Sequence, residues 1–114
     1  MNKKLIVALD FDNAELALNF LENLDPQKCL VKVGLELFIS DGWKVLDSIS
    51  EKGFEIFLDL KLHDIPNTVA NSVKKISNFN VVFTTIHLNG GKDMIEAASS
   101  EKGNIKILGV SILT

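Results

Sequence analysis

Residues 57–68 read FLDLKLHDIPNT, and this stretch joins a strand pattern to the start of a helix. Its first half is apolar apart from Asp59 and Lys61, which the alternation of a strand places on the same side of the sheet. Opposite charges on an apolar strand are costly unless they are paired or used. Asp64 follows where the chain should turn, and Pro66 suits the first position of a helix. The acid–base–acid order therefore predicts a charged site at a strand end.

The rest of the chain alternates between apolar runs of strand length and segments with helical spacing. The expected strands are Leu5–Leu9, Cys29–Gly34, Phe54–Leu60, Val81–Leu88 and Ile105–Leu113. The first expected helix runs from an N-cap at Asp12 or Asn13 to Asp25-Pro26. A broken helical segment follows over Leu35–Ile39 and Trp43–Ile49, with its break at Asp41-Gly42. The last two expected helices are Pro66–Phe79 and Lys92–Ser100. This alternation predicts an α/β fold, with parallel strands joined by right-handed crossovers.

Two α/β architectures share this order of elements, the open doubly wound sheet and the (β/α)8 TIM barrel. The residues after the first strand, ALDFDN at 8–13, lack the glycine-rich fingerprint of a dinucleotide-binding sheet. A barrel instead gathers the carboxyl ends of its strands on one face, and it typically takes about 250 residues. We therefore expect residues 1–114 to be a single domain that covers about the first half of a TIM barrel, from its first strand to its fifth. Polar residues stand at or near five expected strand ends: Asp10, Lys32, Asp59, Lys61, His87 and Thr114.

Composition narrows the class of protein further. Hydrophobic residues make up 46% and charged residues 24%, which is the balance of an ordinary globular domain. The net charge of −3 gives no basic surface for nucleic acid, and no apolar stretch is long enough to span a membrane. The single cysteine, Cys29, suits a reducing compartment, so we expect a cytoplasmic protein without a signal peptide. All 12 basic residues are lysine, so arginine, the usual phosphate clamp, is absent from this sequence.

The charged motif suits one kind of chemistry. A lysine between two carboxylates stays protonated, so Lys61 is a poor base and a good proton donor to a carbanion. No metal-ligand cluster is visible in the sequence to share that task. The alternative for the motif is a structural ion pair at a strand end, and Lys32 could simply extend to the barrel rim. At the end of a strand, His87 favours a hydrogen-bonded structural role over a catalytic one. Gly90-Gly91 fits an anion-binding nest and a tight turn equally well.

Four stretches carry a resemblance to a known family. FLDLKLHDIPNT closely resembles the signature of the orotidine 5′-phosphate decarboxylases, and VALD at 7–10, LVKVGLELF at 30–38 and VSILT at 110–114 support it in the family's order and spacing. The resemblance implies a (β/α)8 barrel that works as a homodimer without cofactor or metal. It implies decarboxylation of orotidine monophosphate to uridine monophosphate, the last step of de novo pyrimidine nucleotide synthesis.

The resemblance also implies roles for residues at the strand ends. Lys61 would donate the proton to C6 of the pyrimidine as carbon dioxide leaves, and Asp59 would lie beside the substrate carboxylate. Lys32 would link the ribose to the charge network, and Asp10 would hydrogen-bond the ribose.

Four further residues receive expected roles in the same way. Asp64 and Thr68 would reach across the dimer interface into the partner's site. Ile65 would belong to the substrate-binding set, and Thr114 matches a threonine that contacts the substrate.

Two rival readings stay open. A metal-dependent sugar-phosphate decarboxylase of the same superfamily shares the D-x-K-x-x-D pattern, and sensitivity to chelators would reveal it. The other is a non-catalytic remnant, which the DNA downstream of the Thr114 codon would distinguish from a longer enzyme. The family's phosphate-gripping arginine and closing loop lie in the second half of its barrel, so we expect the 114-residue polypeptide alone to have little activity. We also expect it to self-associate, because its first and fifth strands would be exposed edges.

Overall fold

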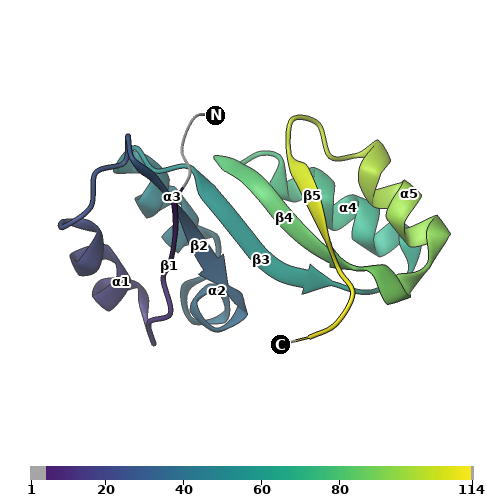
Figure 1. The fold of residues 1–114 in the computed structure, drawn as a ribbon, viewed down its shortest axis with the longest axis horizontal. Helices are drawn as coiled ribbons and strands as arrows, with labels where there is room; N and C mark the ends of the chain where they lie inside the picture. The colour runs from purple at the N-terminus through teal and green to yellow at the C-terminus, as the bar shows by residue number, and fades with distance from the viewer. Residues whose placement is uncertain (1–4, 114) are drawn as a thin grey trace. The chain divides into compact units, whose positions relative to one another are not determined.

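The computed structural model describes residues 5–113, so the predicted site residue Thr114 lies outside the described residues. Strands and helices alternate along this range (Figure 1). The strands are β1 (Leu5–Ala8), β2 (Cys29–Gly34), β3 (Ile56–Leu62), β4 (Val81–His87) and β5 (Lys106–Val110). The helices are α1 (Ala14–Leu21), α2 (Leu35–Asp41), α3 (Trp43–Glu51), α4 (Pro66–Ile76) and α5 (Lys92–Ser100), with a short 3-10 helix η1 (Leu88–Gly90).

The order of the strands separates the two predicted architectures. The strands follow one another in the sheet as they do in the chain, β1-β2-β3-β4-β5. β1 pairs with β2, β2 with β3, and β4 with β5, each in parallel. A doubly wound sheet reverses its strand order at a switch point, whereas a barrel proceeds in one direction. The observed order is therefore the one predicted for a barrel.

Every predicted strand and helix is present, and the bounds of most differ from the prediction by a few residues at one or both ends. β2 and α5 have the predicted bounds, and Gly42, with φ of 59°, makes the predicted break between α2 and α3. β3 was predicted two residues too early, because Phe54 is a core residue that precedes the strand rather than part of it. The expected tight turn at 89–91 is instead the 3-10 helix η1 followed by Gly91 with φ of 92°.

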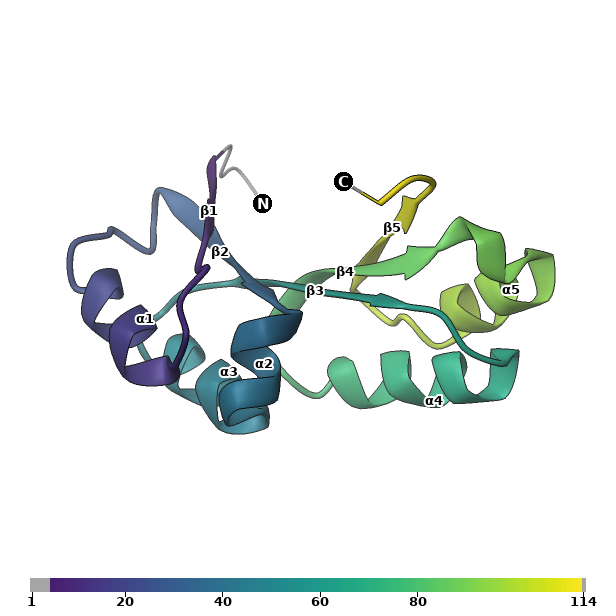
Figure 2. The ribbon, with the colours of Figure 1, turned by 90° about the horizontal axis from the view of Figure 1, so that it is seen from below.

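The chain divides into two compact units, the first ending at Asp59 and the second beginning at Leu60. In the first unit, α2 and α3 lie below β2 in Figure 2, and apolar residues from strands and helices form the core. Cys29 is one of these buried residues, as predicted. The Lys52 ammonium donates a hydrogen bond to Glu22 and holds the pKa of that carboxyl below its usual range. This pair joins the ends of α1 and α3 at the surface.

The second unit has a core cluster of its own. α4 runs beneath β4 in Figure 2, and it packs with α5 on one face of the strands. The buried cluster consists of Val69, Val73, Ile86, Met94 and Ala98, with Leu62, Ile95 and Ile107 packed against it. Leu62 explains why β3 continues past its predicted end, because its side chain packs against this core. In the described part of the chain, no helix is long and apolar enough to cross a membrane.

Candidate active site at the strand ends

An ion pair marks the end of the first unit. Lys32 Nζ of β2 lies 3.8 Å from Asp59 Oδ2 of β3. Asp59 is only 8% exposed, whereas the Lys32 side chain is 27% exposed and reaches water. The parallel register pairs Gly34 with Asp59, and this glycine places no side chain beside the carboxylate. Because a buried carboxylate is costly without a partner, the nearby ammonium of Lys32 accounts for part of its stability there.

Asp10 lies two residues beyond β1, in an exposed position. The Leu9 N–H donates to the Lys32 carbonyl at 2.9 Å, which fixes the end of β1 against β2. The register continues this pairing, with Ala8 opposite Lys32. The sequence thus correctly placed Asp10 just past a strand end, and its expected contact with a ribose stays a prediction.

Lys61 has the most unusual backbone in the described range. Its φ of 51° is the only positive value of a non-glycine residue among residues 5–113. Its N–H donates to Thr85 Oγ1 of β4 at 3.0 Å, and its side chain is partly buried. Lys61 thus departs from the β region while still within β3, and the expectation that Asp59 and Lys61 share one side of the strand stays a prediction.

Two residues predicted to reach a partner protomer, Asp64 and Thr68, stand at the start of α4, with the predicted substrate-binding residue Ile65 between them. Asp64, Ile65 and Thr68 are all exposed, and Ile65 is 65% exposed despite its apolar side chain. Asp64 Oδ1 accepts a hydrogen bond from the Ile65 N–H at 2.7 Å, and Pro66 begins the helix as predicted. The exposure of these residues leaves their expected contacts with a partner or a substrate as predictions.

Sequence reasoning missed two residues near this end of the sheet. The rings of His63 and His87 lie 5.2 Å apart between centroids, with 39° between their planes. His87 ends a predicted strand, whereas His63 stands in the loop between β3 and α4, where the strand pattern gives no signal for it. Thr85, which accepts the Lys61 N–H, was also missed. The available signal was the pair Thr84-Thr85 in an otherwise apolar strand, since a buried hydroxyl needs a partner.

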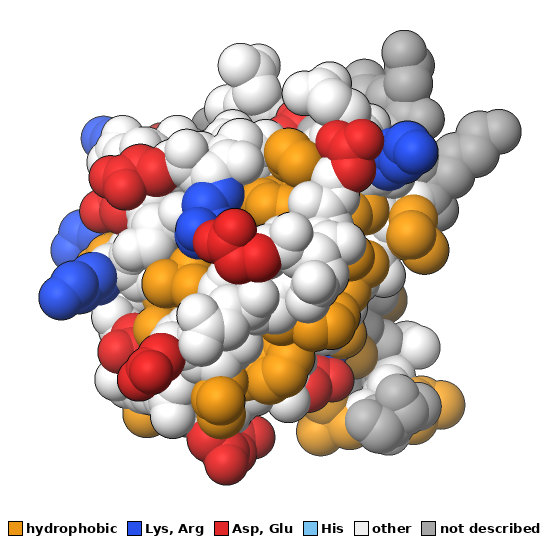
Figure 3. Space-filling model, turned by 90° about the vertical axis from the view of Figure 1, so that its left-hand side faces the viewer, with side chains coloured by type: hydrophobic (Ala, Val, Ile, Leu, Met, Phe, Trp, Pro, Cys, Tyr) orange, Lys and Arg blue, Asp and Glu red, His pale blue; other side chains and the backbone are white. Residues whose placement is uncertain are grey.

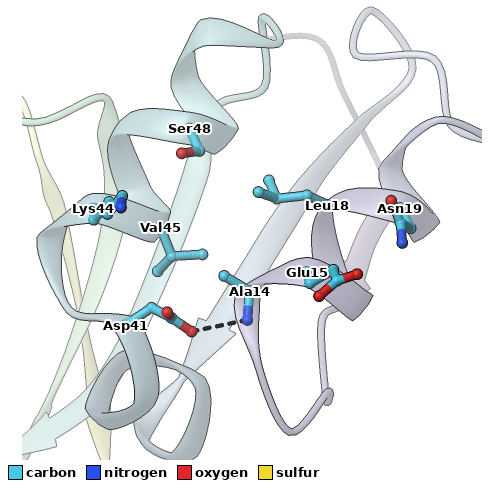
Figure 4. Close-up of a pocket in the computed structure, with 8 residues that line it drawn as sticks. All are labelled: Ala14, Glu15, Leu18, Asn19, Asp41, Lys44, Val45 and Ser48. Atoms are coloured by element: carbon cyan, nitrogen blue, oxygen red, sulfur yellow. Dashed lines mark hydrogen bonds between the residues drawn. The ribbon is translucent and has the colours of Figure 1, made fainter.

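A cavity of about 370 Å³ lies elsewhere, between α1 and α3 (Figure 4). Its lining contains none of the predicted site residues: Ala14, Glu15, Leu18, Asn19, Asp41, Lys44, Val45 and Ser48. Among residues 5–113, no group of three or more His, Cys, Asp or Glu side chains is arranged to hold a metal ion. The charged residues at the strand ends therefore remain the candidate site.

Comparison with known proteins decides the family. Residues 3–114 match the sequence model of the orotidine 5′-phosphate decarboxylase / HUMPS family, which is nearly the whole chain. The chain belongs to this family. The resemblance carried by the four motifs is thereby confirmed.

Relatives within the family are similar along the whole chain. The orotidine 5′-phosphate decarboxylase of Fusobacterium nucleatum is 45% identical over 118 residues, covering 100% of this chain and 50% of the relative. That of Oenococcus oeni is 46% identical over 116 residues, covering 100% of this chain and 51% of the relative. The chain thus spans about half the length of the curated relatives that it matches.

Solved structures of the family confirm the fold. The crystal structure of orotidine 5′-phosphate decarboxylase from Lactobacillus acidophilus has a TM-score of 0.91 and 42% identity, covering 99% of this chain and 55% of that one. The enzyme from Methanocaldococcus jannaschii, complexed with an inhibitor named BMP, has a TM-score of 0.81 and 26% identity, covering 94% of this chain and 51% of that one. The predicted fold, the first half of a (β/α)8 barrel, is therefore confirmed.

Proposed function

We propose that this chain carries the proton-donating half of an active site that decarboxylates orotidine 5′-monophosphate to uridine 5′-monophosphate. The observation that carries the proposal is the ion pair between Lys32 and Asp59. Two residues after Asp59 in the chain, within the motif that carries the family resemblance, Lys61 has a positive φ. The reaction would serve pyrimidine nucleotide synthesis in the cytoplasm, without a cofactor and without nucleic acid as a partner.

The chemistry follows from the charges. The bond between C6 of the pyrimidine and its carboxylate breaks, carbon dioxide leaves, and the electron pair stays on C6. The Lys61 ammonium then donates a proton to C6, which leaves the lysine neutral until it is protonated again from water. Fixed charges oriented before the reaction stabilise such a developing carbanion, because they need no reorganisation during the step. The ion pair of Lys32 and Asp59 supplies fixed charges of this kind.

Other residues would bind the substrate and complete the assembly. Asp10 would hydrogen-bond the ribose, and Lys32 would connect the ribose to the charges around Lys61. Asp64 and Thr68, exposed at the start of α4, would enter the site of a second protomer in a homodimer. The exposure of Ile65 supports a role in the same contact or in substrate binding.

The test requires a complete barrel. We define the completed barrel as this chain followed by the part of the Fusobacterium nucleatum relative that lies beyond the matched half. We expect it to convert orotidine monophosphate to uridine monophosphate, and Lys61→Ala to lower kcat by at least about 10²–10⁴-fold, the usual contribution of a positioned acid. Lys44→Ala, which removes an exposed lysine of α3, is the control and should leave kcat unchanged.

Two results would count against the proposal. Full activity of Lys61→Ala would remove the proton donor from the mechanism. Loss of activity on treatment with a chelator, restored by a divalent metal, would instead favour the metal-dependent sugar-phosphate decarboxylase.

A further inference from the structure

The backbone of Lys61 needs an external support. With φ of 51°, Lys61 adopts the left-handed conformation, in which a side chain with a Cβ crowds the following carbonyl. Glycine accepts this conformation without strain, but this position has a lysine on which the proposed chemistry depends. Strained conformations of this kind persist only where the surroundings hold them in place, and they cluster at functional sites.

Thr85 provides that support. Its Oγ1 accepts the Lys61 N–H at 3.0 Å, where a regular parallel ladder would offer a backbone carbonyl. Thr85 is only 4% exposed and lies within β4, where its backbone is held in register opposite Leu108 of β5. A hydroxyl on a strand segment that is paired with its neighbour from Phe83 to His87 is a rigid acceptor. The strained residue is therefore held by a fixed atom on the neighbouring strand.

We propose that Thr85 is a positioning residue for the reaction, whose hydroxyl holds Lys61 in the left-handed conformation and so sets the direction of its side chain. The inference rests on the proposed function, because it concerns the residue that would donate the proton. Without the hydroxyl, the Lys61 N–H loses its acceptor and the backbone relaxes toward negative φ. The direction of the Cα–Cβ bond then changes, and the ammonium moves away from the position of C6.

The first experiment tests the contact itself, in the completed barrel labelled with nitrogen-15. Thr85→Val keeps the shape of the side chain and removes the acceptor, whereas Thr85→Ser keeps the acceptor. We expect hydrogen exchange of the Lys61 amide to quicken about tenfold in Thr85→Val, as for the loss of one hydrogen bond, and to stay slow in Thr85→Ser. The three-bond coupling between the Lys61 amide and α protons reports the change in φ. Unchanged exchange and coupling in Thr85→Val would overturn the proposal.

The second experiment measures the consequence for catalysis in the completed barrel. We expect Thr85→Val to lower kcat about 10²-fold with KM unchanged, the size of effect that a small misplacement of a reacting group produces. Thr85→Ser should restore kcat to within about threefold of the unsubstituted protein. A KM that rises with kcat unchanged, or a Thr85→Val protein with normal kcat, would overturn the positioning role.

Thr84→Val is the matched control, because Thr84 is the neighbouring threonine of β4 and is fully buried. If the loss of a buried hydroxyl acts only on the structure, Thr84→Val and Thr85→Val should both lower the amount of folded protein, and kcat should not fall in Thr85→Val alone. If the unsubstituted completed barrel shows no decarboxylation, the proposed function fails. The exchange and coupling of the Lys61 amide in Thr85→Val still decide whether Thr85 holds the lysine.

Discussion

At the scale of the residue, the motif FLDLKLHDIPNT indicates a functional site because it places charged side chains in an apolar strand, which fold stability alone does not favour. Charges within an apolar strand require partners, and the structure supplies one such partner in Lys32, 3.8 Å from Asp59. The conformation of Lys61 could not be predicted in this way. Its positive φ depends on a hydroxyl 24 positions later in the chain, and the local sequence does not encode that contact.

Asp59→Asn tests whether the ion pair serves catalysis more than stability. The amide keeps the shape of the side chain and removes its charge, so the field around the reacting carbon weakens. We expect kcat of the completed barrel to fall at least about 10²-fold. The free energy of unfolding of the completed barrel, measured by urea titration, should fall by only about 1 kcal/mol, because Lys32 is 27% exposed and keeps its access to water.

Asp47→Asn in α3 is the control, since Asp47 is exposed and lies outside the predicted site. It should change neither kcat nor unfolding. The fall in kcat can be converted to a loss of transition-state stabilisation. If Asp59→Asn lowers the free energy of unfolding by as much as that loss, the ion pair is chiefly structural.

At the scale of the element, the local sequence predicts the end of a helix or strand correctly where that end depends on neighbouring residues. Gly42 ends α2 and Pro66 begins α4, as their backbone preferences predict. Boundaries that depend on tertiary packing were misplaced. β3 extends to Leu62 because that side chain packs against a core formed by residues later in the chain, and Phe54 is buried outside any strand.

The start of α1 shows how local and long-range signals combine. Asn13 was predicted as an N-cap, and its Oδ1 accepts the Leu16 N–H at 3.0 Å. A second acceptor was not predicted, because Asp41 is 27 residues away in sequence. Its Oδ2 accepts the Ala14 N–H at 2.8 Å, as Figure 4 shows, and also a hydrogen bond from the Ser40 hydroxyl. One carboxylate thus ties the end of α2 to the first turn of α1.

Asp41→Ala should therefore destabilise the chain by about 1 kcal/mol, the usual cost of losing a capping side chain. The carboxylate also faces the positive end of the helix dipole. Asp41→Asn, which keeps an acceptor and removes the charge, should therefore destabilise the chain measurably, but by less than Asp41→Ala. Urea unfolding followed by circular dichroism gives both values, and Asp47→Ala in α3 controls for the loss of an exposed carboxylate. Equal stability of Asp41→Ala and Asp47→Ala would contradict a capping role.

At the scale of the whole molecule, each end of the sheet carries exposed apolar residues. Leu5 and Ile6 of β1 are 57% and 44% exposed, and Leu108 of β5 is 40% exposed. Figure 3, which views the molecule from the side of β1 and α1, shows hydrophobic side chains at the surface between charged ones. Exposed apolar edge strands are templates for pairing with another chain. In a barrel of eight strands, these edges would be covered by the remaining strands.

The chain alone should therefore differ from the completed barrel in both assembly and activity. We expect the 114-residue chain to sediment as a mixture of associated species and to turn over orotidine monophosphate slowly or not at all. The completed barrel should sediment as a single species of about two chains and be active. The reason lies in the proposed mechanism, in which binding of the phosphate at a remote point would offset the cost of placing the carboxylate of the substrate beside Asp59. The sequence contains no arginine for that grip. Rapid turnover by a monodisperse 114-residue chain would show that the strand-end charges are sufficient by themselves, and it would remove the phosphate grip from the mechanism.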